Sequence, residues 1–198
     1  MQKPYIQLDQ NFPGIVSLFM YDKETAKNLS AMAETIMRRP RAGLSVGERE
    51  LIASFVSNLN ECKFCTDSHT ACAEQYLGED TVREVIRRSN AEALPMRMQA
   101  LLSVAACVQA LDRDQLAVQV KVAKDLGVTD EELHDTVLVC AFFNMCNRYV
   151  DGLGTTFRPG EPEEGGRSLH KYGYIFGVRR FFGEVLPKMW NQFWSQGG

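Results

Sequence analysis

The chain lacks the features that mark several large classes of protein. Its formal net charge is −3, with 22 lysine and arginine residues among 198, so we expect no basic surface for nucleic acid. The longest nearly apolar stretch, residues 137–146, is interrupted by Asn144 and is too short to span a bilayer. The first residues contain no basic segment followed by an apolar one, which is the pattern of a signal peptide. We therefore expect a cytoplasmic protein with no nucleic-acid or membrane partner.

The sequence also lacks the alternation of apolar and polar residues that is typical of strands, because its apolar residues recur with helical spacing almost throughout. Two capping boxes, Ser45-x-x-Glu48 and Thr129-x-x-Glu132, mark the starts of two helices. The pattern predicts an all-α fold with helices over residues 22–39, 45–60, 62–78, 81–89, 97–111, 115–126 and 129–152.

The character of the chain changes after these helices. Residues 158–166 are polar and rich in proline and glycine, which predicts a loop. An aromatic tail follows over residues 172–194. We expect a helical domain over residues 1–156, and a loop with an aromatic C-terminal extension over residues 157–198 that packs on the same domain or on a neighbouring subunit. The excess of apolar surface favours a homo-oligomer, with its interface at residues 22–60 or in the tail.

Six cysteines are present, and an even number could form three disulfides in a secreted protein. Cys107, Cys140 and Cys146, however, lie within apolar helical runs, where a free cysteine behaves as a small hydrophobic residue. We expect redox chemistry at Cys62 and Cys65 alone, in a protein of a reducing compartment.

The segment from Cys62 to His69 contains a C-x-x-C motif at the expected start of a helix. Two thiols at this spacing can close into a disulfide, and the helix N-terminus favours a thiolate. His69 lies one helical turn after Cys65 on the same face, where it can take the proton of that thiol. Cys72 shares this face, and we interpret it as structural. The segment therefore predicts a redox-active dithiol with its own base.

Two other interpretations fit the same residues. Cys65 and His69 could be buried on a core-facing stripe of the helix. Cys62, Cys65 and His69 could instead bind zinc, with Cys72 or Glu50 as a fourth ligand. Structural zinc sites usually take a second ligand pair from a distant segment, and the other two histidines stand alone in the sequence. We therefore expect no metal and no cofactor.

Glu50 lies on the preceding helix, in line with Ala53, Ser54 and Ser57 and opposite the apolar stripe. This pattern by itself favours a carboxylate in solvent. The small residues beside Glu50, however, would let another helix approach closely and bury it. A buried carboxylate next to His69 would orient the imidazole ring and support its proton transfer.

Four residues form the pattern E-x11-C-x-x-C-x3-H: Glu50, Cys62, Cys65 and His69. This pattern resembles the signature of the alkylhydroperoxidase D and carboxymuconolactone decarboxylase superfamily. A later stretch, residues 142–154 behind residues 129–133, resembles the peroxidase-related members, and the likeness extends over about residues 20–155. The resemblance implies an alkylhydroperoxidase D-like helical bundle, usually assembled as trimers or hexamers, with Glu50 in the site.

The resemblance also implies the chemistry of a cofactor-free thiol peroxidase. Cys65 would attack a hydroperoxide, Cys62 would convert the sulfenic acid to a disulfide, and a dithiol partner would reduce that disulfide. His69 and Glu50 would relay the proton. One departure from the pattern is Phe64, which stands where the best-studied hydroperoxidases carry a second histidine.

Other functions fit the same motif. Decarboxylase members act on a lactone and need no cysteine pair, so the pair argues against that reaction. A general disulfide oxidoreductase would use the dithiol without a preference for peroxide. A non-enzymatic module that senses redox state or holds zinc would use it without turnover, because a family resemblance does not fix the substrate.

Overall fold

The computed structural model describes residues 3–40, 43–88 and 91–175, and it confirms the all-α fold expected from the sequence. These ranges contain nine helices and no strand: α1 (Ile15–Tyr21), α2 (Lys23–Arg38), α3 (Val46–Leu59), α4 (Lys63–Leu77), α5 (Glu79–Arg88), α6 (Met96–Ala110), α7 (Arg113–Asp125), α8 (Asp130–Gly152) and α9 (Glu161–Tyr172). None of these helices combines the length and the apolar character that a membrane span requires. Most of the expected aromatic extension lies outside the described residues, and the expected homo-oligomer stays a prediction.

Side-chain caps fix the starts of several helices close to the positions that the sequence predicts. The Asp22 side chain accepts hydrogen bonds from two backbone N–H groups of α2. Complete capping boxes at Ser45 and Thr129 begin α3 and α8. The sequence pattern missed α1, a helix of seven residues that follows Gly14.

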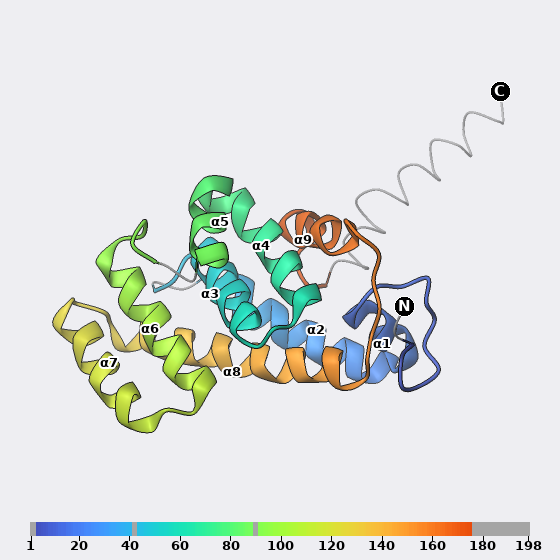
Figure 1. Ribbon diagram of the computed structural model, residues 1–198, viewed down its shortest axis with the longest axis horizontal. Helices are drawn as coiled ribbons and strands as arrows, with labels where there is room; N and C mark the ends of the chain where they lie inside the picture. The colour runs from blue at the N-terminus through green and yellow to red at the C-terminus, as the bar shows by residue number, and fades with distance from the viewer. Residues whose placement is uncertain (1–2, 41–42, 89–90, 176–198) are drawn as a thin grey trace.

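Helix α8, with 23 residues, runs along one side of the molecule, from the α6–α7 pair at one end to α1 at the other (Figure 1). Helix α3 packs against both α4 and α8, and Leu51, Ile52 and Val56 of α3 belong to the main apolar cluster. Arg49 of α3 donates to Asp135 of α8 at 2.9 Å, in a buried ion pair. Because α3 has neighbours on several sides, the side chains that it directs toward α4 are removed from water.

The prediction of a loop over residues 158–166 is wrong from residue 161 onward, because α9 begins there. Pro162 fits the first turn of a helix, because a backbone N–H at this position would have no acceptor within the helix. Acidic side chains at the start of α9 and basic ones at its end match the helix dipole. Gly165 and Gly166 lower the helix propensity, which is why the composition indicated a loop.

Gly166 allows α9 to pack closely on α4, its neighbour in Figure 1. A Cβ atom at Gly166 would lie 2.0 Å from the backbone oxygen of Ser68 and 2.9 Å from the Cβ atom of Ala71. The missing side chain therefore lets the two helix backbones approach each other. As a result, Ser68 and Ala71 are buried under α9 rather than exposed to solvent.

We expect Gly166→Ala to lower the free energy of unfolding by about 1–3 kcal/mol, the usual cost of overpacking a close contact. The matched control is Gly165→Ala, because a Cβ atom at Gly165 meets nothing within 4 Å. The control should be neutral or should stabilise by up to about 1 kcal/mol, since alanine favours helix more than glycine does. Urea unfolding at a fixed protein concentration measures both changes. Equal effects of the two substitutions would contradict the close packing of α9 on α4.

Candidate active site

The two cysteines of the motif lie in the first turn of α4. Cys62 is the N-cap residue of this helix, Cys65 lies three positions later, and both are free thiols. Cys62 has no exposed surface and Cys65 is 4% exposed. At a helix N-terminus, unpaired N–H groups and the positive end of the helix dipole favour a thiolate.

The Cys62 thiol holds its proton more tightly than an ordinary cysteine does. A hydrogen bond with the Cys65 sulfur raises the pKa of Cys62 above its ordinary value, and burial acts in the same direction. The negative charge of Asp151, at the end of α8, raises the pKa of Cys62 further. Cys62 therefore keeps its proton and donates it toward the Cys65 sulfur.

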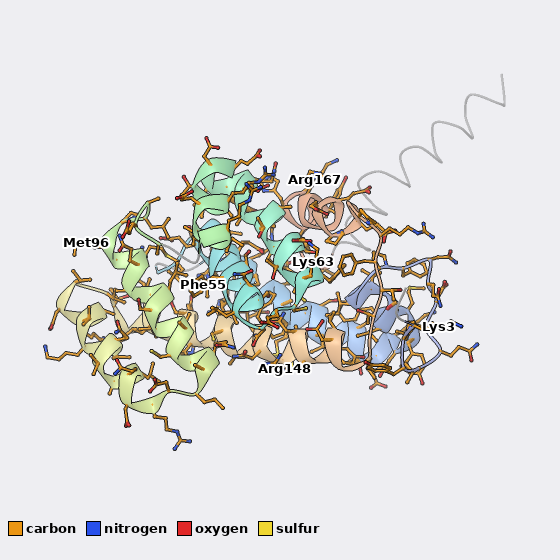
Figure 2. The ribbon with its side chains drawn as sticks, viewed as in Figure 1. Lys3, Phe55, Lys63, Met96, Arg148 and Arg167 are labelled. Carbon is orange, nitrogen blue, oxygen red and sulfur yellow. The ribbon has the colours of Figure 1, made fainter. Side chains whose placement is uncertain are left out.

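A polar cluster around the buried Asn60 and Asn147 fixes the turn between α3 and α4 and so the position of Cys62. The Asn60 side chain donates from Nδ2 to Oδ1 of Asn147 at 2.8 Å, and Arg148 donates to Oδ1 of Asn60 at 3.1 Å. Figure 2 labels Arg148 on α8 and Lys63 in the first turn of α4, the helix that this turn leads into. The backbone N–H of Cys62 donates to the last turn of α3 at 3.0 Å, which places the first cysteine of the motif directly after this cluster.

One turn after Cys65, His69 forms a buried pair with Glu50 of α3. The His69 Nδ1 atom lies 2.8 Å from Oε2 of Glu50. Glu50 has no exposed surface and His69 is 7% exposed. The His69 ring also makes a T-shaped contact with Phe143 of α8, with ring centroids 4.4 Å apart. When Glu50 is ionised, Nδ1 donates to it, so the basic lone pair of the imidazole lies on Nε2.

The position of Glu50 opposite the apolar stripe favoured a solvent-exposed carboxylate, and that interpretation is wrong. Small residues of α3 let α4 approach closely enough to cover Glu50. The Oγ atom of Ser54 lies 2.6 Å from Oγ1 of Thr70, and Ser54 is fully buried. Near the start of α3, a Cβ atom at Gly47 would lie only 2.6 Å from the Cβ atom of Tyr76.

Comparison with known proteins agrees with this architecture. The model of the carboxymuconolactone decarboxylase family matches residues 23–91, while no curated protein sequence matches significantly. A solved structure of an uncharacterized peroxidase-related protein from Silicibacter sp. superposes with a TM-score of 0.65 and 26% identity, over 74% of this chain and 77% of that one. A second solved structure, of an alkylhydroperoxidase core described as an uncharacterized peroxidase-related protein from Ralstonia eutropha, gives a TM-score of 0.67 and 24% identity, over 78% of this chain and 81% of that one.

The chain is similar to the carboxymuconolactone decarboxylase family over residues 23–91. Its segment that matches the family model contains all four residues of the sequence motif: Glu50, Cys62, Cys65 and His69. The likeness to the two solved structures extends the shared fold over about three quarters of the chain.

Phe64 is the residue at which the sequence departs from the hydroperoxidase pattern that it resembles. Its ring packs against Phe157 with centroids 5.6 Å apart, within the apolar cluster that contains both motif cysteines. A Cβ atom at Gly14 would lie 2.4 Å from the Phe64 ring, so the segment before α1 also lies directly against it. Phe64 therefore forms an apolar cover beside the cysteine pair and supplies no base there.

Sequence reasoning missed two residues of this site. Tyr174, which follows α9, donates its hydroxyl to Oε1 of Glu50 at 2.9 Å. The carboxylate of Asp151 faces the thiol of Cys62, and each affects the proton affinity of the other. Asp151 lies within the stretch that resembles the peroxidase-related proteins, and Tyr174 lies in the aromatic tail. One sequence gave no signal that connects either residue to its partner in the site.

Cys72 lies next to this site and is fully buried. Burial raises the pKa of Cys72 above its ordinary value, and the negative charge of Glu50 raises it further, so Cys72 stays a neutral thiol. In the part of the chain that the structure describes, no three His, Cys, Asp or Glu side chains are grouped so that they could hold a metal ion.

We expect Asp151→Asn to speed the alkylation of Cys62 by iodoacetamide about two- to fivefold near neutral pH, the size of effect that a partly exposed charge exerts. The carboxylate disfavours a thiolate on Cys62, and the amide removes this charge at nearly the same shape. Mass mapping separates the Cys62 rate from that of Cys65. Asp67→Asn, which removes a carboxylate paired with Lys63 on α4, is the matched control and should leave the Cys62 rate unchanged. An unchanged rate in Asp151→Asn would show that Asp151 does not act on this thiol.

Proposed function

We propose that the protein is a cofactor-free thiol peroxidase that reduces hydroperoxides through Cys65 and Cys62. The observation that supports this function best is the grouping of the two thiols at the start of α4 with the His69–Glu50 pair one turn away. Cys62 is held as a protonated donor to the Cys65 sulfur, while His69 stands one turn away with its Nδ1 engaged by Glu50. A nucleophilic thiolate beside a protonated thiol and a base is what two-step peroxide reduction requires.

In the first step, His69 accepts the proton of Cys65 on Nε2, and the Cys65 thiolate attacks the O–O bond. The terminal oxygen is transferred to the sulfur, which becomes a sulfenic acid, and the alkoxide leaves. The imidazolium returns the proton to the alkoxide, so that an alcohol is released. Glu50 stabilises the imidazolium between these two transfers.

In the second step, the Cys62 sulfur attacks the sulfenic sulfur of Cys65, and a disulfide and one molecule of water form. Thiol–disulfide exchange with an external dithiol then returns both cysteines to thiols, and that dithiol is oxidised to a disulfide. The hydroperoxide is the substrate of this cycle and the dithiol is its reductant.

A thiol count with one equivalent of tert-butyl hydroperoxide tests this function directly. We expect the loss of two thiols per chain and a Cys62–Cys65 disulfide in the peptide map. The four other cysteines serve as internal controls, because they should stay reduced. Rapid disulfide exchange without consumption of the hydroperoxide would instead identify a general disulfide oxidoreductase.

We expect Cys65→Ser to abolish peroxide consumption, because only the thiolate that meets the oxidant starts the reaction. Cys62→Ser should retain a single turnover and leave a sulfenic acid on Cys65, which a dimedone adduct detects by mass. Cys72→Ser is the control and should retain repeated turnover. If Cys62→Ser loses the first turnover while Cys65→Ser keeps it, the roles of the two cysteines are reversed.

We expect His69→Ala to slow the oxidation of Cys65 near neutral pH by about 10²- to 10⁴-fold, the usual contribution of a positioned base. The loss should shrink as the pH rises, because bulk hydroxide then supplies the thiolate. Glu50→Gln should slow the same step by less, since the amide can still orient the ring. Stopped-flow oxidation rates across a pH series measure both variants. An unchanged pH–rate profile in His69→Ala would exclude the proton relay.

A further inference from the structure

The segment after α9 brings a tyrosine hydroxyl to the buried Glu50–His69 pair. Tyr174 donates to Oε1 of Glu50 at 2.9 Å, while Oε2 of the same carboxylate faces Nδ1 of His69 at 2.8 Å. The Tyr174 ring stacks on the His69 ring, with centroids 6.3 Å apart and an angle of 13° between the planes. The Tyr174 hydroxyl also lies 3.5 Å from Nδ1 of His69, so Tyr174 contacts Glu50 through its hydroxyl and His69 through both its hydroxyl and its ring.

Several contacts hold the segment in this place. Arg38 of α2 donates to the backbone oxygens of Leu169 and His170, in the last turn of α9, at 3.0 and 3.2 Å. Gly173 then ends the helix with a φ of +73°, a conformation that glycine adopts without strain. The backbone N–H of Tyr174 donates to Oε2 of Glu34 at 2.8 Å. The hydroxyl of Tyr174 is thus delivered to Glu50 by an anchored segment.

The groups around the Glu50–His69 pair determine whether Tyr174 can donate a hydrogen bond to Glu50. Burial raises the pKa of Tyr174 well above its ordinary value, and the charge of Glu50 acts in the same direction, so the phenol keeps its proton and can donate. The other titratable or charged groups around the pair come from three helices: Cys65, Cys72 and Tyr76 of α4, Glu34 and Arg38 of α2, and Cys146 of α8. Cys72, Tyr76 and Cys146 are neutral near pH 7, since their pKa values are raised above ordinary values, chiefly by burial.

We propose that Tyr174 is a positioning residue that holds the Glu50 carboxylate in its charged form and thereby lowers the proton affinity of the Glu50–His69 pair. A hydrogen bond to a carboxylate favours the ionised state. Without this donor, a buried negative charge is compensated less well, and the pair binds a proton more tightly, whichever of the two residues carries it. Any effect of Tyr174 on turnover rests on the proposed thiol chemistry. Its effect on the proton affinity of the Glu50–His69 pair does not.

The test is a histidine NMR titration of the full-length protein and its Tyr174→Phe variant. The chain has three histidines, so His134→Gln and His170→Gln assign the His69 resonance by elimination. We expect the midpoint of the His69 titration in Tyr174→Phe to rise by about one pH unit, a tenfold gain in proton affinity of the size expected for a hydrogen bond to a charged group. A merely structural role of the ring would not move this midpoint, because phenylalanine keeps the ring and its stacking.

Tyr76→Phe is the matched control, because it removes another phenol hydroxyl at the junction of α4 and α9, one that accepts from Arg38 at 3.1 Å. This control should leave the His69 midpoint where the wild-type protein has it. A His69 midpoint that does not differ between wild type and Tyr174→Phe, or that falls, overturns the proposal, and so does an equal rise in Tyr76→Phe. The outcome is independent of peroxide: a protein that fails to consume hydroperoxide but shows the midpoint shift loses the proposed function and keeps this inference.

Discussion

The carboxylate of Glu50 is buried with no exposed surface, and the arrangement of the site depends on how that charge is compensated. A buried carboxylate costs several kcal/mol unless donors replace the water that it loses. His69 and Tyr174 supply such donors on the two oxygens. Burial itself requires α3 and α4 to lie close together, which the small side chains of Ser54 and Gly47 permit. The close packing of α3 on α4 therefore determines the environment of the Glu50 carboxylate, the His69 imidazole and the Tyr174 hydroxyl.

The contact between Glu50 and His69 also determines which nitrogen of the imidazole ring is basic. Because Glu50 engages Nδ1 of His69, the basic nitrogen of the ring is Nε2. The cysteine pair has an asymmetry of its own, since Cys62 lies at the helix N-cap near the negative charge of Asp151 and donates toward Cys65. The carboxylate of Glu50 thus faces Nδ1 of His69, while the charge of Asp151 disfavours a thiolate on Cys62.

Local patterns in the sequence predicted the helices well, because periodicity and capping boxes such as Ser45-x-x-Glu48 act within a few residues. Failures occurred where a distant contact overrides the local preference. Gly165 and Gly166 indicate a loop by propensity, yet α9 forms because Gly166 fits against the backbone of Ser68. The position of Glu50 on its helix likewise indicated solvent, although the small residues beside it showed how α4 could cover it. The burial of Glu50 follows from the pairing of two helices, which periodicity within one helix does not reveal.

The site also extends beyond the segment that the family model matches. The family model matches residues 23–91, which carry the glutamate, both cysteines and the histidine. Phe143, which packs on the His69 ring, and Asp151, which faces Cys62, both lie on α8, and Tyr174 follows α9. The matched segment therefore supplies the four motif residues, while later parts of the chain supply the side chains that contact them. Two members with the same motif can differ in reactivity when these later contacts differ, because a buried carboxylate–imidazole pair responds to each donor and charge placed next to it.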